Sequence, residues 1–164
     1  TLHHNWFEHI DDRTPRARFG NIHCFNNVVV AAENAVMSVM GAATLVEHCF
    51  FRDVRIATSF SHAKDLASEG KGGRLSILES RNVDPRPRTS PKTEGEAFEQ
   101  EHNFTNSPEL EPFEFNAPAA AFPWPDRRRP PYSAAIDPVD EVPALVEKFA
   151  GTFKQAVQSA EGAK

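Results

Sequence analysis

Cysteine, tyrosine and tryptophan are scarce in this chain of 164 residues, and long apolar runs are missing from it. Two cysteines are too few for a disulfide scaffold or for a zinc site built from four thiolates. No segment approaches the about 18 consecutive apolar residues of a membrane-spanning helix, so we expect no membrane partner. Positive charge is not in excess either, because the formal net charge is -5 and the isoelectric point is near 5.8. That balance argues against a nucleic-acid-binding protein, whose phosphate contacts need a basic face.

Phenylalanine and proline, by contrast, are abundant. The chain has 13 of each, and ten of the prolines lie between Pro85 and Pro131. Hydrophobic residues make up 40% and charged residues 25%, as in ordinary globular proteins, and the length is typical of one domain. Because proline cannot donate a backbone hydrogen bond to a neighbouring strand, we predict that the proline-rich residues 85–131 form a surface excursion. We predict stacked strands over 1–84 and a C-terminal segment over 132–164.

The first sixty residues repeat with a period of 22. Three rows carry the repeat: His3-His4-Asn5-Trp6-Phe7, Phe25-Asn26-Asn27-Val28-Val29 and Glu47-His48-Cys49-Phe50-Phe51. Two further apolar columns are in phase with them, namely Leu2, Cys24 and Val46, and Ile10, Ala32 and Val54. A short period made of β-type runs indicates a parallel β-solenoid, in which each repeat is one coil that lies directly on the last.

Stacked coils bring equivalent residues together as ladders. Asn5 and Asn27 fall in one column, where side-chain amides both donate and accept hydrogen bonds, and Cys49 follows them as a small buried residue. Cys24 shares the column of Val46, so Cys49 lies three residues further along the neighbouring strand and out of disulfide reach. We therefore expect two free, buried thiols.

Two later segments also carry regular patterns. The alternation from Arg74 to Leu78 predicts a strand that ends near Asn82. Apolar residues at helical spacing predict a helix near the C-terminus, with Asp140 as its N-cap. The residues of this stripe are Val142, Leu145, Val146, Phe149 and Phe153. We expect the helix to cover an exposed edge of the solenoid, where strands would otherwise be unpaired.

Three arginines, at positions 13, 16 and 18, lie within six residues and beside Asp11 and Asp12. One interpretation is a solvated loop with local salt bridges. The other is a site for anions, because the guanidinium fork matches a carboxylate and several forks in a row suit a polymer of carboxylates. The acidity of the chain disfavours nucleic acid as that polymer and favours a polyuronic acid.

At this point the residues resemble a known family. The chain carries, in order, Thr1-Leu2-His3-His4-Asn5-Trp6-Phe7, Arg13-Thr14-Pro15-Arg16-Ala17-Arg18 and Gly20-Asn21-Ile22-His23-Cys24-Phe25-Asn26-Asn27. These three segments are similar to three motifs of the pectate lyase family. The motifs are a histidine-histidine-asparagine strand, an arginine-x-proline-arginine-x-arginine loop and a glycine-x-x-histidine-x-x-asparagine-asparagine strand. The next coil is also similar, although Cys49 stands where the family usually has asparagine, and so is the C-terminal stretch 131–151.

The resemblance implies an all-β fold, a right-handed parallel β-helix of which this chain has the C-terminal coils, and cleavage of polygalacturonate by β-elimination. It implies that Arg13 abstracts the C5 proton of the uronate and that Arg18 binds the substrate carboxylate, while Arg16 shapes the loop or faces the substrate. A free guanidinium loses its proton only above about pH 12. For Arg13 to act as a base, desolvation and like-charge repulsion therefore have to favour its neutral form. We expect a secreted protein that takes polygalacturonate or pectin as its partner and is a monomer in full-length form.

The resemblance also implies Ca²⁺, which would neutralise the substrate carboxylate and stabilise the developing enolate. In the family the acidic ligands and a catalytic lysine lie upstream of the histidine-histidine-asparagine strand, where this sequence starts. Asp11 and Asp12 are in the wrong place to replace them. We therefore expect no metal ligands in this chain and little or no lyase activity from it alone.

Two alternative functions stay open. A pectin lyase would act on methyl-esterified polymer without calcium and tends toward an aromatic groove, for which Trp6 and Trp124 are too few to decide. A non-catalytic β-solenoid would bind acidic polysaccharide or pack on a partner. His3, His4 and His9 suggest zinc only weakly, because no compact set with cysteine or glutamate completes a site, and we interpret them as solvated or ladder histidines.

Overall fold

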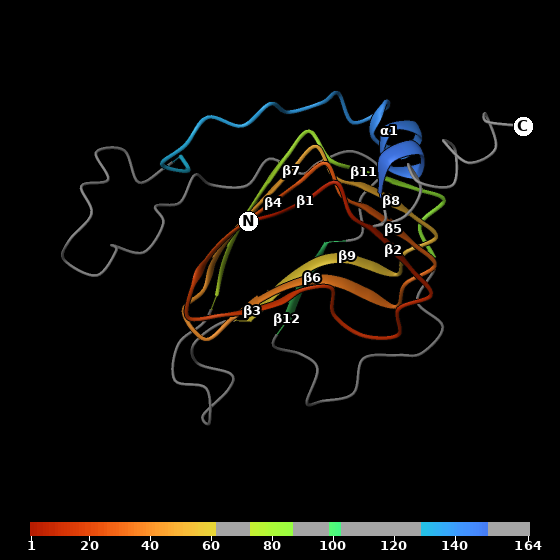
Figure 1. Ribbon diagram of the computed structural model, residues 1–164. Coiled ribbons are helices and arrows are strands. Elements are labelled where there is room, and N and C mark those ends of the chain that lie inside the picture. The colour runs from red at the N-terminus through yellow and green to blue at the C-terminus, as the bar shows by residue number, and fades with distance from the viewer. Residues whose placement is uncertain (62–72, 87–98, 103–128, 151–164) are drawn as a thin grey trace, which may run out of the picture.

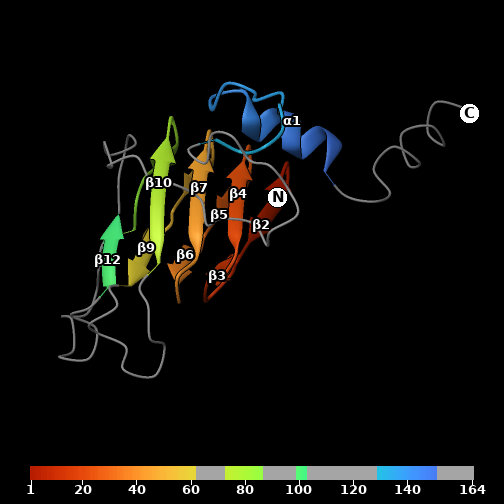
Figure 2. The same ribbon diagram turned by 90° about the vertical axis from the view of Figure 1, so that its left-hand side faces the viewer.

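The strands of this protein stack in three sheets that wind around one bore. A computed structural model describes residues 1–61, 73–86, 99–102 and 129–150. Each of the first coils contributes one strand to every sheet, and the chain turns clockwise as it recedes from the viewer (Figures 1 and 2). The fold is therefore a right-handed parallel β-helix, as the sequence predicts.

Hydrogen bonding orders the strands by coil. The first sheet runs β1 (Leu2–His3), β4 (Asn21–Phe25), β7 (Ala43–Glu47) and β10 (Arg74–Leu78), all parallel. The second runs β11 (Arg81–Val83), β8 (Phe50–Arg52), β5 (Val28–Val30) and β2 (Trp6–Glu8), also parallel. The third runs β12 (Glu99–His102), β9 (Ile56–Ser61), β6 (Asn34–Val39) and β3 (Arg16–Arg18), of which β12 alone is antiparallel to its neighbour.

The register confirms the 22-residue repeat. Leu2 pairs with Cys24, and Cys24 pairs with Val46, so the predicted apolar column is one row of the stack. The amide of Asn5 donates to Oδ1 of Asn27 at 2.9 Å, which confirms the asparagine ladder. Both cysteines are free and buried, as predicted.

Sharp corners separate the first sheet from the second. The residue at this corner has a left-handed backbone in each coil: His4, Asn26, His48 and Glu79, with φ between 42° and 53°. The left-handed conformation is unfavourable for residues other than glycine and is best tolerated by asparagine. The polar side chains that follow it, such as the buried Asn27, bond to backbone groups that the corner leaves unpaired.

The only helix among the described residues is α1 (Val142–Phe149), which confirms the helical stripe up to Phe149. Phe153 lies outside the described residues. Glu141, not Asp140, occupies the N-cap, and the side chain of Glu141 makes no cap bond. Asp140 pairs instead with Arg81. No helix of the described part is long and apolar enough to cross a membrane.

The helix packs on the outer face of the second sheet and not on an open end of the coils (Figure 1). Val142 and Val146 are buried against Val28 and Val30 of β5, with Trp6 partly buried beside them. The prediction of an edge cover was wrong on this point. Valines that face outward from β5 expose an apolar surface, and burying that surface is favourable.

Two further sequence predictions need adjustment. The strand that begins at Arg74 ends at Leu78, and a corner at Glu79 separates it from β11, so the expected single strand to Asn82 is two. Most of residues 85–131 lies outside the described residues, and the surface excursion therefore stays a prediction. Within it, β12 pairs with β9.

Candidate functional site

The arginine loop connects β2 to β3 at the corner between the second and third sheets. Two backbone hydrogen bonds tie it to the coil below: the amide of Thr14 donates to the carbonyl of Ala35 at 2.8 Å, and the amide of Met37 donates to Pro15 at 2.9 Å. Arg13 has a left-handed backbone with φ of 42°, and the Thr14–Pro15 peptide bond is cis. The loop is thus held on β6 at Thr14 and Pro15.

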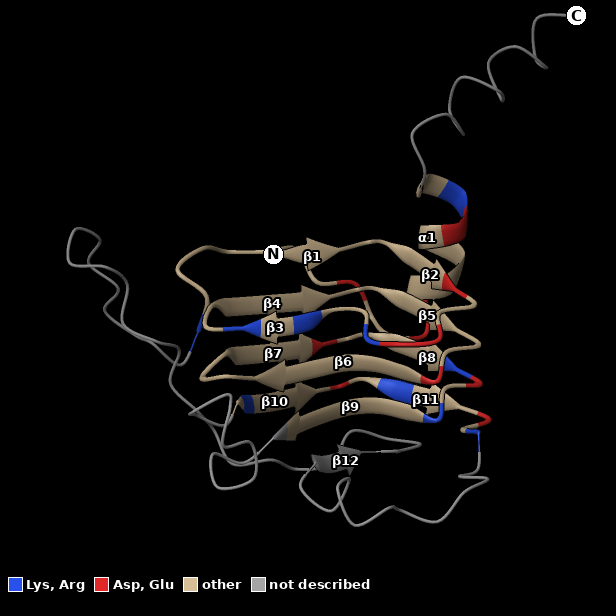
Figure 3. Ribbon diagram, turned by 90° about the horizontal axis from the view of Figure 1, so that it is seen from below, with Lys and Arg blue, Asp and Glu red and all other residues tan. Residues whose placement is uncertain are grey.

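The strand β3 places two of the arginines on one surface. Successive side chains of a strand point to opposite faces, and Ala17 is buried with 4% of its surface exposed. Arg16 and Arg18 therefore both point outward from the third sheet, where Arg16 is half-buried and Arg18 is exposed. Blue segments flank the middle of β3 in Figure 3. The structure places both predicted binding arginines beside each other on an accessible face.

Arg13 precedes β3 in the chain, and its side chain contacts two groups. Its Nη1 forms an ion pair with Oδ2 of Asp12, and its Nε donates to Sδ of Met37 at 3.1 Å. The side chain of Arg13 is 35% exposed, so an incoming anion can reach it. Met37 is also the register partner of Arg16. Met37 therefore contacts Arg13 and lies beside Arg16 in the third sheet.

The carboxylate of Asp12 belongs to a column of polar side chains that sequence reasoning missed. The amide of Asn34 donates to Oδ1 of Asp12 at 3.3 Å, and Nη2 of Arg55 donates to Oδ1 of Asn34 at 3.2 Å. These three residues come from three successive coils. Their signal was present in the repeat, because Asn34 follows Asp12 by one period of 22 residues.

The column continues through further ion pairs, and charged residues gather along this corner in Figure 3. Arg55 pairs with Glu33, and Arg86 pairs with Glu33 at 3.7 Å. Arg86 also binds both carboxylate oxygens of Asp53, at 3.0 and 2.7 Å. The hydrogen bonds from Arg86 lower the pKa of Asp53, because they favour the ionised carboxylate.

The arrangement at the top of this column is a cationic surface. Arg13 lies on the loop, Arg16 and Arg18 lie on one face of β3, and Asp12 forms an ion pair with Arg13. A surface of this kind binds carboxylates through charge-assisted, forked hydrogen bonds. In the parts of the chain that the structure describes, no three His, Cys, Asp or Glu side chains gather as a metal site would require.

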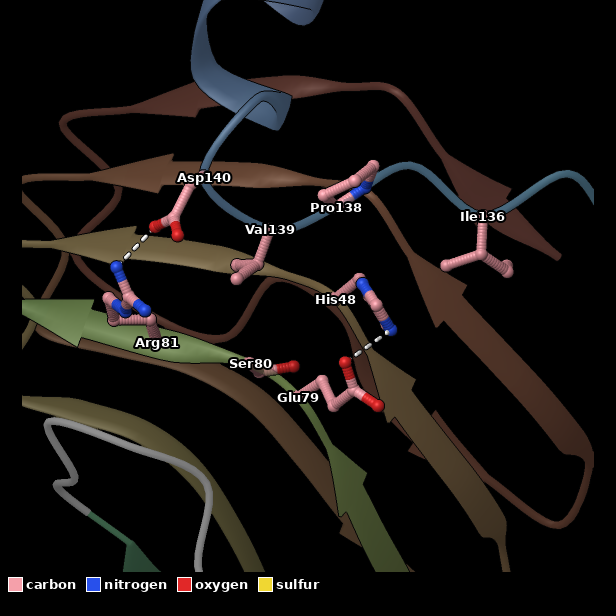
Figure 4. Close-up of a pocket in the computed structure, with 8 residues that line it drawn as sticks. All are labelled: His48, Glu79, Ser80, Arg81, Ile136, Pro138, Val139 and Asp140. Atoms are coloured by element: carbon pink, nitrogen blue, oxygen red, sulfur yellow. Dashed lines mark hydrogen bonds and ion pairs between the residues drawn. The ribbon is translucent and has the colours of Figure 1, made fainter.

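A cavity of about 590 Å³ lies elsewhere, under the segment that leads into α1 (Figure 4). The segment lines it with Ile136, Pro138, Val139 and Asp140, and the corner of the third and fourth coils lines it with His48, Glu79, Ser80 and Arg81. His48 pairs with Glu79 at 3.3 Å, and Arg81 pairs with Asp140. The cavity therefore lies between the C-terminal segment and the coils, and two ion pairs line it. None of the three arginines lines it.

Comparison with known proteins agrees with the fold and the motifs. The family model described as pectate lyase matches residues 1–152. A pectate trisaccharide-lyase of Bacillus licheniformis is 27% identical over 160 residues, which cover 94% of this chain and 35% of that protein. Pectate lyase D of Dickeya chrysanthemi is 57% identical over 83 residues, or 50% of this chain and 21% of that protein.

A solved structure of a pectate lyase from Xanthomonas campestris has a TM-score of 0.60 at 18% identity, over 93% of this chain and 40% of that one. This likeness supports the shared fold. The chain spans about a third of the length of the Bacillus relative. Because the family model covers nearly all of the sequence, the chain belongs to the pectate lyase family.

Proposed function

We propose that the arginine loop and the outer face of β3 bind polygalacturonate and supply the proton-abstracting group of a β-eliminating lyase. Family membership supports the reaction, and the relatives named above are described as pectate lyases. The observation that carries the proposal is the placement of Arg16 and Arg18 on one face of β3, next to Arg13 on the preceding loop. The proposal includes an extracellular location.

In this proposal Arg13 removes the C5 proton of a galacturonate residue. The electron pair of the broken C–H bond forms the C4–C5 double bond, the bond from C4 to the glycosidic oxygen breaks, and that oxygen takes a proton from solvent. Arg18 binds the carboxylate attached to C5, where negative charge develops as the proton leaves. Arg16 faces the neighbouring part of the polymer and adds a second carboxylate-binding fork.

A base has to be neutral, whereas Asp12 stabilises the positive charge of Arg13 through their ion pair. The pair therefore has to open before Arg13 acts. Repulsion of Asp12 by the substrate carboxylate that Arg18 holds would do this, and exclusion of water around the bound polymer would then disfavour the charged guanidinium. The charges of Arg16 and Arg18 act in the same direction.

The calcium ion that the family implies does not fit the described residues. Asp12 is the carboxylate nearest the arginines in the sequence for which contacts are known, and its two oxygens already accept from Asn34 and Arg13. No group of three metal-ligating side chains accompanies it among the residues that are described. No step of the proposed mechanism therefore passes through calcium.

Isothermal titration with trigalacturonate tests the binding half of the proposal. We expect Arg18→Ala to lower the affinity by about tenfold or more, because it removes a charge-assisted hydrogen-bonding group. Arg52→Ala is the matched control, since Arg52 is exposed and lies on β8 of the second sheet. Loss of binding in both variants to the same extent, or no binding by the wild-type chain, would contradict the proposal.

The catalytic half is tested by the ultraviolet absorbance of the unsaturated uronate product, with Ca²⁺ and with EDTA. We expect little turnover from this chain alone, and we expect Arg13→Lys to remove it while trigalacturonate still binds. Retention of turnover in Arg13→Ala, which has no basic group at position 13, would exclude Arg13 as the base. Robust turnover that EDTA abolishes would show that the chain does hold a metal site.

A non-catalytic polysaccharide-binding role is the second candidate, and the lack of a metal-ligating group in the described residues favours it. The lyase and the non-catalytic binding protein differ in whether unsaturated product forms. Binding of trigalacturonate that depends on Arg18, with no unsaturated product under any condition, would favour the binding role. Pectin lyase activity is tested in the same assay by replacing the acid polymer with its methyl ester.

A further inference from the structure

The two oxygens of the Asp12 carboxylate have different partners. Oδ2 forms the ion pair with Arg13, and Oδ1 accepts from the amide of Asn34. Asn34 is itself oriented, because its own carbonyl oxygen accepts from Arg55. An asparagine amide has one acceptor and one donor end, and here each end has a defined partner, so the amide cannot flip without losing both bonds.

Arg55 is a firm support for this amide. Its side chain is 14% exposed, and it pairs with Glu33, which precedes Asn34 in the same coil. Its backbone amide donates to Ala32 at 3.1 Å, so strand stacking fixes its position as well. A side chain that is fixed by packing and hydrogen bonds also fixes the orientation of the group it binds, whereas an exposed ion pair alone is weak and mobile.

We propose that Asn34, held by Arg55, is a positioning residue that keeps the Asp12 carboxylate on Arg13 until a bound uronate displaces it. Asp12 then acts as an internal competitor of the ligand, because Arg13 cannot both hold the Asp12 carboxylate and face C5 of the uronate. The identity of the ligand rests on the proposed function, whereas the arrangement of Asp12 in the free protein does not.

The free protein is tested first. Arginine-labelled full-length chain gives side-chain Nε–H signals in nuclear magnetic resonance, and the signal of Arg13 is the one that Arg13→Lys removes. We expect this signal to move in Asp12→Asn and to move in the same direction in Asn34→Ala. Asn34→Asp should do the same, because a carboxylate at position 34 repels Asp12. Arg52→Ala is the control and should leave the Arg13 signal in place.

Titration with trigalacturonate is tested second. We expect Asp12→Asn to bind about two- to fivefold more tightly than wild type, because the internal competitor is gone. A merely structural Asp12 would give weaker binding instead. The Arg13 signal of the wild-type chain should move during the titration in the direction seen for Asp12→Asn.

The outcomes separate the two proposals. An Arg13 signal that moves in Asp12→Asn but stays in both Asn34 variants overturns the positioning role of Asn34. Unchanged or weaker binding by Asp12→Asn overturns the competition. If wild type does not bind trigalacturonate at all while the signals of the free protein behave as expected, the positioning role stands and the proposed function fails.

Discussion

Asn26 and Asp137 exchange two hydrogen bonds across 111 residues of sequence. The side-chain amide of Asn26 donates to the carbonyl of Asp137 at 2.8 Å, and the backbone amide of Asp137 donates to Oδ1 of Asn26 at 2.9 Å. Asn26 is fully buried at a left-handed corner, and the carboxylate of Asp137 separately pairs with His4 at 2.8 Å. One asparagine thus anchors the segment that carries the C-terminal helix.

We expect Asn26→Gly to lower the free energy of unfolding by about 1–3 kcal/mol, because the half-buried backbone groups of Asp137 lose their partners. Asn26→Ala should lower it further, since alanine is strained at a φ of 49° and glycine is not. Urea unfolding measures both, and hydrogen exchange at the Asp137 amide shows whether the segment opens locally. Asp137→Ala keeps the backbone bonds, so a loss as large as that of Asn26→Gly would contradict this account.

The asparagine ladder gives a second stability prediction. Asn27 accepts from the backbone amide and the side-chain amide of Asn5, at 3.1 and 2.9 Å, and donates to the carbonyl of Leu2 at 2.9 Å. Asn27→Ala should lower the free energy of unfolding by about 2–3 kcal/mol, because buried donors and acceptors are left unmatched. Asn5→Ala removes a half-buried side chain from the same ladder and should have a smaller effect in the same urea titration.

The two thiols should be inert in the folded protein. Burial raises the pKa of Cys49 to about 11 and also raises the pKa of Cys24, so little thiolate forms at neutral pH. We expect no reaction with a chromogenic disulfide reagent at about pH 8 in native buffer, and two equivalents of reaction after unfolding in guanidinium chloride. Fast reaction of either cysteine in native buffer would show that the bore opens to solvent.

Glu47 makes stability depend on acid pH. The hydrogen bond from His23, at 3.0 Å, is the main reason that the pKa of Glu47 lies below its usual value of 4.5. A lowered pKa means that the ionised form is preferred in the folded state, so the stabilisation is present above the unfolded pKa and is lost as the pH falls through the folded pKa.

Between about pH 5 and about pH 3 the wild-type chain should therefore lose more stability than Glu47→Gln. Urea unfolding at each pH gives the two slopes. Asp11→Asn serves as the control, because Asp11 is exposed, and it should follow the wild-type profile. Equal slopes for wild type and Glu47→Gln would show that this pair does not control the acid response.

The 22-residue repeat by itself determined the coils, because stacking at one strand spacing requires equivalent residues to recur at a fixed period. Leu2, Cys24 and Val46 show this directly: they are one column in the sequence and one row of the first sheet. The free cysteines follow from the same register. The arginine loop was also recognisable, because all of its residues are adjacent in the chain.

Only the tertiary structure decided how distant segments meet. The C-terminal helix has a clear apolar stripe, but its target, the outward valines of β5, is a surface that exists only after the coils have formed. Asp140 has the residue type of an N-cap, yet its pairing with Arg81 depends on where the segment crosses the coils. Side-chain contacts between coils, such as Asn34 with Asp12, need the direction of each side chain as well as the register, and the repeat specifies the register alone.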